Sequence, residues 1–353
     1  MTRALKVGKV PVGGGAPVSV QSMANVDPHD AAALSAQIAA CAALGCDIFR
    51  LTVPDLAAAK TLGEVRTTSP IPLVADIHFD YRCALAAIDA GADALRLNPG
   101  NIGGRDRVQA VARAAKAKGV PIRIGVNFGS LEKDLDAEVR AGRMRVAEAL
   151  VRSALGHLRL LEDEGFRDVV ISVKASNVAD TLESYRLLAE RTDCPLHVGV
   201  TEAGTFIPGT VRNSVALGIL LSEGIGDTIR VSLTDRPERE VRVGVEILRS
   251  LALRPAGPSI TSCPTCGRTK VDLFKVASEV ENALEELALR ERRPMPRVAV
   301  MGCVVNGPGE AKGADVALCG GNGEFMVYVH GRQVARVSEA EAAKKVLEYV
   351  VSL

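Results

Sequence analysis

The chain has 353 residues, a length that suits a barrel-sized domain followed by a smaller one. Its formal net charge is +1, from 43 basic and 42 acidic side chains, so no bulk field attracts nucleic acid or an anionic membrane. Aromatic residues make up 3% and tryptophan is absent, which argues against base-stacking surfaces. No uncharged apolar stretch reaches roughly 18 residues and Met1–Val7 is unlike a signal peptide, so we expect a cytoplasmic protein that binds neither nucleic acid nor membrane.

Short β-branched segments alternate with longer segments of helical period along most of the chain. The expected strands are 18–23, 47–54, 72–78, 94–99, 121–127, 169–175, 195–202 and 228–233, and helical periodicity is clear over 31–44, 107–118, 147–164 and 180–191. This alternation predicts an α/β protein with a (β/α)8 TIM barrel. A doubly wound open sheet is the alternative, but no Gly-x-Gly-x-x-Gly follows the first strand. The triplet Gly13-Gly14-Gly15 runs into a strand and predicts a plain turn.

Five of the predicted strands carry a basic residue between aliphatic neighbours, which places it on one face of its strand. In such barrels the active site lies where the strands end. The five cations and the polar residues near them are Arg50, Arg96, Arg123, Lys174 and Arg230, with Asn98, Asn127 and Ser232. The acids expected nearby, chiefly Asp76 and Glu202, are too few to pair with all five. The excess positive charge predicts a small ligand with more than one phosphate.

Three residues at predicted strand ends are candidates for proton transfer. Glu202, in Thr201-Glu202-Ala203-Gly204, is the first of them. Asp76 and His78 are the second choice, because they share one face at the end of strand 72–78. A histidine at a strand end is more often a satisfied hydrogen-bonding group than a catalyst, and its closeness to Asp76 favours the catalytic role here.

The segment Pro255-Ala256-Gly257-Pro258 breaks the alternation and predicts a boundary between a substrate-binding barrel domain, 1–254, and a second domain, 255–353. Within the second domain we expect a helix over 271–290 and a strand over 297–301. A hairpin over 325–337, turning near His330-Gly331, and a last helix over 339–350 complete it. These elements predict a small α+β domain with its own core.

Three cysteines of the second domain form a pattern typical of a soft-metal site. Cys263 and Cys266 are separated by two residues, and Cys303 precedes a Gly-Pro-Gly loop. Structural zinc would prefer a further cysteine or histidine pair, which the sequence lacks, so an iron–sulfur cluster is the favoured interpretation. Glu310 is the candidate fourth ligand, because the turn before it brings its carboxylate back. Cys319 is the rival, and it would make a closed site for electron transfer or structure.

With these residues assembled, the chain resembles the family of bacterial 4-hydroxy-3-methylbut-2-enyl diphosphate synthases of the methylerythritol phosphate route to isoprenoids. The resemblance covers nearly the whole chain. It rests on blocks at 20–23, 74–82, 97–103, 122–134, 172–176, 201–204, 220–233, 263–266 and 302–310.

The resemblance implies a [4Fe–4S] cluster held by Cys263, Cys266, Cys303 and Glu310, with Glu310 able to leave its iron. It implies that the barrel binds 2-C-methyl-D-erythritol 2,4-cyclodiphosphate and opens its ring reductively, with loss of water. Ferredoxin or flavodoxin would supply the electrons singly. It also implies a homodimer with a shared active site, in which the cluster domain of one subunit covers the barrel mouth of the other.

The sequence departs from the family pattern at two loops. Residues 26–30 read Val-Asp-Pro-His-Asp where threonines are common, and residues 205–208 are bulkier than usual. Arg212 stands where a lysine is common and keeps the charge, so we include it among the substrate-binding residues. A rival class, a zinc protein whose second domain only binds partners, would explain the cysteines without catalysis. A radical S-adenosylmethionine enzyme would need Cys-x-x-x-Cys-x-x-Cys, which does not occur.

Overall fold

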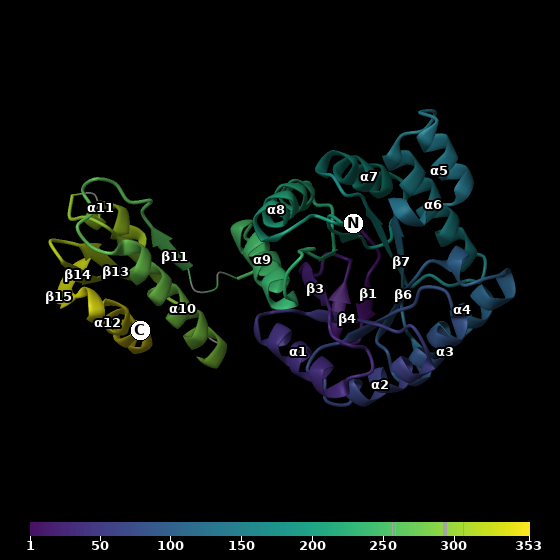
Figure 1. Cartoon of the computed structure of the whole chain (residues 1–353), viewed down its shortest axis with the longest axis horizontal. Helices are drawn as coiled ribbons and strands as arrows, with labels where there is room; N and C mark the ends of the chain where they lie inside the picture. The colour runs from purple at the N-terminus through teal and green to yellow at the C-terminus, as the bar shows by residue number, and fades with distance from the viewer. Residues whose placement is uncertain (256, 258, 292–294, 306) are drawn as a thin grey trace. The chain divides into compact units, whose positions relative to one another are not determined.

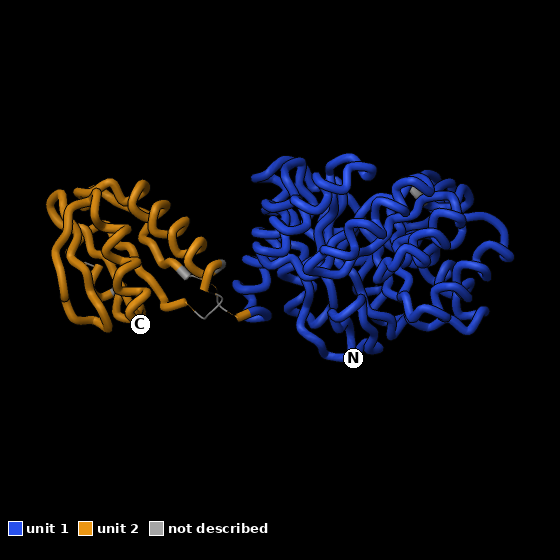
Figure 2. The backbone as a smooth tube through the Cα atoms, turned by 90° about the horizontal axis from the view of Figure 1, so that it is seen from below, with its two compact units in different colours: residues 1–254 blue, residues 255–353 orange. Residues whose placement is uncertain are grey.

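The computed structural model describes residues 1–255, 257, 259–291, 295–305 and 307–353, without the side chains of residues 130, 259, 289 and 310. The chain forms two compact units, Met1–Arg254 and Pro255–Leu353 (Figure 2). Within the described ranges, none of the helices combines the length and the hydropathy that a membrane span needs.

Eight parallel strands form the centre of the first unit, whose backbone is described throughout (Figure 1). They are β3 (Ser19–Met23), β4 (Ile48–Thr52), β5 (Leu73–Asp76), β6 (Ala94–Leu97), β7 (Ile122–Asn127), β8 (Val169–Lys174), β9 (His197–Val198) and β10 (Thr228–Ile229). Strands β3 to β8 pair in chain order, and β10 pairs with both β3 and β9. A parallel bridge between Ile171 and Leu196 brings the two ends together. The predicted TIM barrel is confirmed.

Strands β9 and β10 are shorter than the segments expected for them. Their ladder covers two residues on each strand, whereas the sequence predicts eight and six. At Gly199 the backbone lies so close to the Arg230 carbonyl oxygen that a Cβ would sit 2.4 Å from it. Beyond this contact both segments are loops, so several candidate site residues lie on loops and not on strands.

Helices follow the strands and surround them. They are α1 (Ala31–Ala43), α2 (Leu56–Arg66), α3 (Tyr81–Asp89), α4 (Arg105–Lys118), α5 (Lys133–Arg140), α6 (Val146–Glu162), α7 (Val178–Arg191), α8 (Phe206–Ser222) and α9 (Pro237–Ser250). Asp30 and Asp55 begin α1 and α2 by accepting a backbone N–H three residues later, both at 2.9 Å. Gly119 ends α4 with a φ of 65°, a left-handed conformation that glycine adopts without strain.

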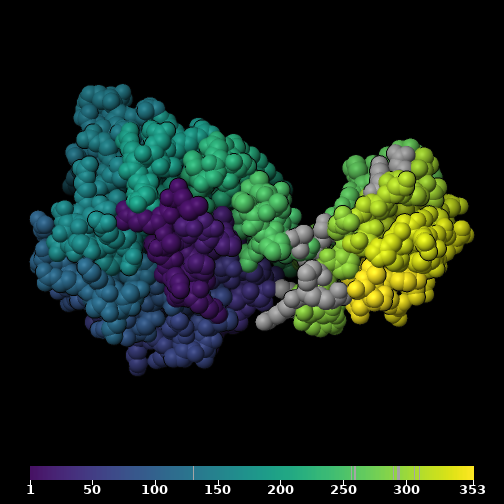
Figure 3. Space-filling view, turned by 180° about the vertical axis from the view of Figure 1, so that it is seen from behind, coloured from purple at the N-terminus to yellow at the C-terminus, as the bar shows by residue number. Residues whose placement is uncertain are grey.

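A hairpin at the N-terminus, which the sequence did not predict, closes one end of the barrel. Strands β1 (Leu5–Val7) and β2 (Val10–Val12) pair antiparallel, and Val7 and Val12 pack against Ile48, Val74 and Val170. The N-terminal segment covers a patch in the middle of one face of the first unit in the space-filling view (Figure 3, purple). The hairpin fills the end of the barrel where the parallel strands begin. The open end, which we call the mouth, is therefore the one where the strands finish.

The second unit is a five-stranded sheet with two long helices. Its strands, in spatial order, are β11 (Ser259–Ser262), β12 (Arg297–Met301), β13 (Val316–Gly320), β14 (Glu324–Val329) and β15 (Arg332–Ser338). The first three are parallel and the last two form an antiparallel hairpin. Helices α10 (Leu273–Glu291) and α12 (Glu339–Ser352) share one apolar core with the sheet. The expected helices, hairpin and strand are confirmed, whereas β11 and β13 were not predicted.

Candidate functional site

The cations of strands β4 and β6 meet at one buried carboxylate. Asp76, at the end of β5, is 2% exposed. Arg96 Nη1 donates to Asp76 Oδ1 at 3.2 Å, and Arg50 Nε lies 3.6 Å from Asp76 Oδ2. Burial raises the pKa of Asp76, but Arg50 and Arg96 outweigh it and hold the pKa below the usual value. Asp76 therefore stays ionised as the counterion of two arginines.

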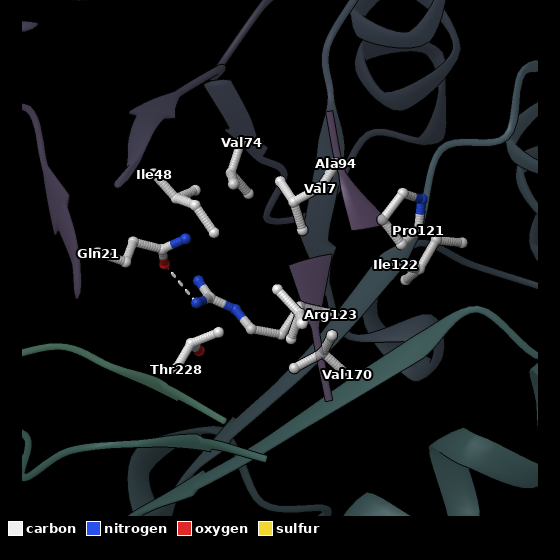
Figure 4. Close-up of a pocket in the computed structure, with 11 residues that line it drawn as sticks. Val7, Gln21, Ile48, Val74, Ala94, Pro121, Ile122, Arg123, Val170 and Thr228 are labelled. Atoms are coloured by element: carbon white, nitrogen blue, oxygen red, sulfur yellow. Dashed lines mark hydrogen bonds between the residues drawn. The ribbon is translucent and has the colours of Figure 1, made fainter. Parts of the chain in front are cut away.

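Arg123, on β7, is buried, and none of the described carboxylates is in hydrogen-bond contact with it. Its Nη1 donates to the amide oxygen of Gln21 on β3 (Figure 4). Its Nε and Nη2 have no hydrogen-bond partner among the described residues. Burial, reinforced by Arg50 and Arg96, lowers the pKa of Arg123 well below the usual value. A guanidinium held in this way can offer two further N–H groups to an anion.

A small cavity lies beside Arg123, between the barrel interior and the N-terminal hairpin. Its volume is about 20 Å³, and Gln21, Arg123 and Thr228 are the polar residues in a mainly apolar lining (Figure 4). Such a volume holds a single water molecule and not a substrate. A substrate must therefore enter from the mouth.

Lys174 ends β8 and is buried among the other cations. Burial lowers its pKa well below the usual value, and Arg230 and Arg123 lower it further. Glycines leave room for these cationic groups. A Cβ on Gly199 would sit 2.9 Å from Lys174 Nζ, and a Cβ on Gly125 would sit 2.6 Å from Arg96 Nε. Both glycines therefore allow a cation to lie directly against the backbone.

Glu240, on α9, is a buried carboxylate that sequence reasoning missed. Its Oε1 accepts the Leu233 N–H at 3.0 Å and lies 3.4 Å from Arg230 Nη2. Its Oε2 accepts the Ser22 hydroxyl at 2.8 Å. In the sequence it is one of several acids at the start of an amphipathic helix, so no local signal distinguishes it. Glu240 occupies the counterion role that the sequence analysis gave to Glu202.

The five cations therefore face two buried carboxylates among the described residues of the barrel, Asp76 and Glu240. When all five are protonated, three positive charges remain uncompensated. Like charges buried together are unfavourable unless a ligand neutralises them. The arrangement suits a small polyanion.

Two further residues of the barrel interior were not singled out from the sequence. Gln21 accepts from Arg123, and His197, on β9, has its Nδ1 2.5 Å from the Thr228 hydroxyl. Burial lowers the pKa of His197 well below the usual value, and Arg123 and Lys174 reinforce the effect, so the imidazole stays neutral. His197 stands between Leu196 and Val198, and this polar residue in an apolar segment is a signal that could have indicated it. Gln21 lies in a strand with two serines, so no such signal distinguishes it.

The remaining candidates lie at the rim. Glu202 is exposed and has a φ of 53°, a backbone conformation that is uncommon outside glycine. His78 is exposed, two residues beyond the end of β5. Arg212, on α8, donates to the Ala203 carbonyl oxygen at 2.8 Å and so holds the loop that carries Glu202.

The three polar candidates of the mouth sit on strand ends or loops. Asn98 Oδ1 accepts the Gly125 N–H at 2.9 Å and is buried. Asn127 ends β7 and pairs in register with Lys174. The Ser232 carbonyl oxygen accepts from Asn213 at 3.3 Å, and its side chain is partly exposed.

The cysteines of the second unit follow the ends of neighbouring parallel strands. Ser262 pairs with Val300, so Cys263 and Cys303 leave the sheet at the same edge. Cys263 Sγ accepts the Gly302 N–H at 3.2 Å. A Cβ on Gly302 would sit 2.8 Å from the Thr269 hydroxyl, and that hydroxyl accepts the Cys266 N–H at 3.3 Å. The turn with Cys266 therefore packs against the loop that carries Cys303.

The donor chemistry of this edge fits a thiolate-bound metal. Cys266 is exposed, and the hydrogen bond from Arg268 at 3.5 Å lowers the pKa of its thiol. A lowered pKa favours the thiolate that a soft metal binds. In the described part of the chain, no three His, Cys, Asp or Glu side chains lie close enough to hold one metal ion. Glu310 ends the short helix α11 (Gly307–Glu310), and its side chain lies outside the described residues, as does Asn306.

Cys319, the rival ligand, lies on β13 and is fully buried. It pairs in register with Met301 and belongs to a small apolar cluster with Ala299 and Ala311. Burial raises the pKa of its thiol to about 12. This environment is that of a core thiol, and it favours the protonated side chain over a thiolate ligand.

A parallel (β/α)8 barrel with basic side chains gathered in its interior is typical of the class of TIM-barrel enzymes. The model of the GcpE TIM-barrel domain matches residues 2–245, and that of the GcpE protein C-terminal domain matches residues 259–352. The chain belongs to the GcpE family, whose curated members matched here are named 4-hydroxy-3-methylbut-2-en-1-yl diphosphate synthase (flavodoxin). The family and the enzyme class predicted from the sequence are confirmed.

The similarity to these relatives extends over almost the whole chain. The synthase of Geobacter sulfurreducens is 54% identical over 349 residues, covering 99% of this chain and 97% of the relative. The synthase of Symbiobacterium thermophilum is 52% identical, covering 99% and 92%.

Solved structures of low identity share the barrel. A 3-dehydroquinate dehydratase from Geobacillus kaustophilus is 14% identical with a TM-score of 0.50, over 71% of this chain and 99% of that one. A truncated 3-deoxy-D-arabino-heptulosonate 7-phosphate synthase from Thermotoga maritima is 10% identical with a TM-score of 0.50, over 71% and 91%. These similarities extend to the fold alone.

Proposed function

We propose that the chain catalyses the reductive ring opening and dehydration of 2-C-methyl-D-erythritol 2,4-cyclodiphosphate to 4-hydroxy-3-methylbut-2-enyl diphosphate in non-mevalonate isoprenoid biosynthesis. The observation that carries the proposal is the excess of buried and partly buried cations inside a barrel whose sequence matches synthases of that product over almost its whole length. The negative charge of a cyclic diphosphate would neutralise the positive charge that the barrel carboxylates leave uncompensated.

The substrate-binding roles follow from the donors that each side chain can offer. Arg123 has two N–H groups without a partner among the described residues, and Arg230 has its Nε in the same state. Arg50 directs Nη2 at the Met23 sulfur, at 2.7 Å, which is a weak acceptor that an anion can replace. We assign Arg50, Arg96, Arg123, Lys174 and Arg230 to the two phosphates. We assign Asn98, Asn127, Arg212 and Ser232 to the rim of the same site.

We assign proton transfer to the exposed side chains of the rim, Glu202 and His78. Asp76 is held ionised between two arginines, so its role is to fix their positions. Glu202 and His78 lie at the mouth, where a substrate could reach them. The left-handed backbone of Glu202 supports a functional role, because strained residues often mark active sites.

Cys263, Cys266, Cys303 and Glu310 are the proposed ligands of a [4Fe–4S] cluster in the second unit. Three thiolates at one edge of the sheet suit such a cluster, and a carboxylate is a weaker fourth ligand than Cys319 would be. When bound, the cluster would supply electrons one at a time. The barrel residues then have to hold the substrate, exclude water and deliver protons.

We further propose that flavodoxin or ferredoxin is the electron donor and that the enzyme is a homodimer with a shared active site. The relatives' name includes flavodoxin. The homodimer is supported by a row of exposed aliphatic side chains at four-residue spacing on α8, namely Ile207, Val211, Val215 and Ile219. Among the described residues, which include all eight cysteines, no disulfide forms, which suits the reducing cytoplasm where we propose that the enzyme acts.

The proposed function is tested by anaerobic purification, followed by analysis of iron, sulfide and zinc. The electron paramagnetic resonance spectrum of the reduced protein is recorded before and after adding the cyclodiphosphate. About four irons per chain and a spectrum that changes with the substrate are expected. Stoichiometric zinc, or a signal indifferent to the substrate, would contradict the assigned chemistry and favour the zinc interpretation.

Substitution of Glu310 by alanine is expected to lower iron content or turnover while the barrel stays folded, because the change lies outside the barrel unit. Iron and sulfide per chain, together with far-ultraviolet circular dichroism, measure the two effects. The matched control is Glu348→Ala, which changes an exposed acid near the C-terminal end of α12 in the same unit. Normal iron content and normal turnover in the Glu310 variant would remove it from the ligand set.

Binding of the cyclodiphosphate is expected to be coupled to proton uptake at Lys174. In the ligand-free barrel the pKa of Lys174 is lowered by burial and by Arg230 and Arg123. A bound anion favours the ammonium and raises this pKa. The protein therefore takes up protons on binding between the two pKa values, and affinity falls as the pH rises from the lower value to the upper one. Calorimetric titrations in two buffers of different ionisation enthalpy measure the uptake. Equal uptake in Lys174→Met would exclude Lys174 as its origin.

A further inference from the structure

His157 lies on α6, outside the ring of strands, and contacts two loops of the barrel mouth. Its side chain is 5% exposed. Its Nδ1 accepts the Gly100 N–H at 3.2 Å, and its Nε2 lies 3.3 Å from Glu132 Oε1. Gly100 follows β6, and Glu132 follows β7 as the residue that begins α5. One imidazole thus joins two loops that are separate in the sequence.

The two contacts require one form of the ring. Because Nδ1 accepts a hydrogen bond it carries no proton, so the proton of the neutral ring is on Nε2, the nitrogen that lies 3.3 Å from Glu132 Oε1. Burial lowers the pKa of His157, which keeps the ring neutral and compatible with both contacts. The Glu132 carboxylate lies at the other side of the ring and is 41% exposed.

Gly100 is shaped for this imidazole. A Cβ at position 100 would lie 2.5 Å from His157 Cε1 and 3.2 Å from Nδ1. Such a contact is too short, so any larger residue would displace the ring or the loop. Position 100 therefore requires glycine, because a side chain there would collide with the His157 ring.

The joined loops carry two of the candidate substrate-binding residues. Asn98 directly precedes the short helical turn Pro99–Asn101 that contains Gly100. Asn127 ends β7, five residues before Glu132. Asn98 is also tied to β7 through the Gly125 N–H. A change in the position of either loop would therefore move an amide group at the mouth.

We propose that His157 is a positioning residue that fixes the loops after β6 and β7 and so places Asn98 and Asn127 for the diphosphate. The inference rests on the proposed function for the identity of the ligand. The clamp itself rests only on the contacts of Gly100, His157 and Glu132. A buried histidine that only fills space would stabilise the fold without affecting ligand affinity in particular.

Hydrogen exchange of the ligand-free protein tests the clamp without reference to the ligand. In His157→Ala and in Glu132→Ala, amides of residues 98–104 and 128–135 are expected to exchange about ten-fold faster, the change that loss of one hydrogen bond or close polar contact produces. The rest of the barrel is expected to be unchanged. Glu132→Ala severs the clamp at its exposed end and so avoids a core cavity. Faster exchange throughout the barrel, or none at the two loops, would overturn the clamp.

Steady-state kinetics with the cyclodiphosphate then test the positioning role, using Arg113→Ala on the exposed face of α4 as the control. His157→Ala and Glu132→Ala are expected to raise KM about ten-fold at unchanged iron content. Since asparagine can place an acceptor near the position of Nδ1, His157→Asn should recover part of the loss. Unchanged KM in both alanine variants would overturn the positioning role.

Failure of the parent enzyme to turn over the cyclodiphosphate would instead contradict the proposed function. The hydrogen-exchange result would still decide whether the clamp exists, because it is measured without ligand.

Discussion

Replacing Arg123 with methionine is expected to weaken binding of the cyclodiphosphate about 100-fold, the loss that two charge-assisted hydrogen bonds produce. The buried guanidinium has Nε and Nη2 without a partner among the described residues. Both nitrogens are donors, and one phosphate can accept a hydrogen bond from each of them at the same time. Methionine fills a similar volume but has no donor and no charge.

The same substitution is expected to leave the free energy of unfolding within about 1 kcal/mol of the parent value. Gln21 loses the donor that it accepts from, which is unfavourable. The change also removes a buried cation from beside Arg50 and Arg96, which is favourable, because those cations already lower the pKa of Arg123. The two effects have opposite signs.

Isothermal titration with the cyclodiphosphate and urea denaturation measure the two quantities for Arg123→Met. Arg113→Met, on the exposed face of α4, is the control for charge and should change neither. Equal affinity in the Arg123 variant and the parent would remove Arg123 from the site. A loss of affinity accompanied by a large loss of stability would show that Arg123 serves the fold and not the ligand.

Replacing Glu240 with alanine is expected to lower the free energy of unfolding by about 3 kcal/mol, as when one partner of a buried charge pair is removed. The carboxylate is buried and accepts from the Ser22 hydroxyl and the Leu233 N–H. It is also the near counterion of Arg230. Alanine leaves all three groups without this acceptor, in an interior that already holds an excess of cations.

Urea denaturation followed by circular dichroism measures the effect of Glu240→Ala. Glu246→Ala is the matched control, because it lies on the same helix and its side chain is 68% exposed. The control is expected to change stability by less than about 0.5 kcal/mol. Similar stability of the two variants would show that Arg230, Ser22 and Leu233 find other partners, and Glu240 would then have no structural role at the mouth.

The barrel could be predicted from the sequence because its signals are local. Side-chain direction repeats every two residues in a strand and every 3.6 residues in a helix. A run such as Ile122–Asn127 can therefore be predicted as a strand from its own residues alone. The same period placed Arg50, Arg96 and Arg123 on one face of their strands. The structure places all three inside the barrel.

The N-terminal hairpin could not be predicted from local sequence patterns. Strands β1 and β2 have three residues each, too few for a period to be recognised. They are strands because Val7 and Val12 fill the open end of a barrel that the rest of the chain builds. Similarly, β9 and β10 end early because of the close approach at Gly199, a contact between distant segments.

By itself, the sequence determined the barrel, the number of its strands, the cationic character of their ends, the cysteine motif and the family. Each of these follows from residue type and spacing along the chain. Only the tertiary structure decided which carboxylates neutralise the cations and which side chains hold the mouth loops. Glu240 is 218 residues from Ser22, and His157 is 57 from Gly100. Their hydrogen bonds are made only after α9 and α6 have packed on the barrel, so no spacing in the sequence could have predicted them.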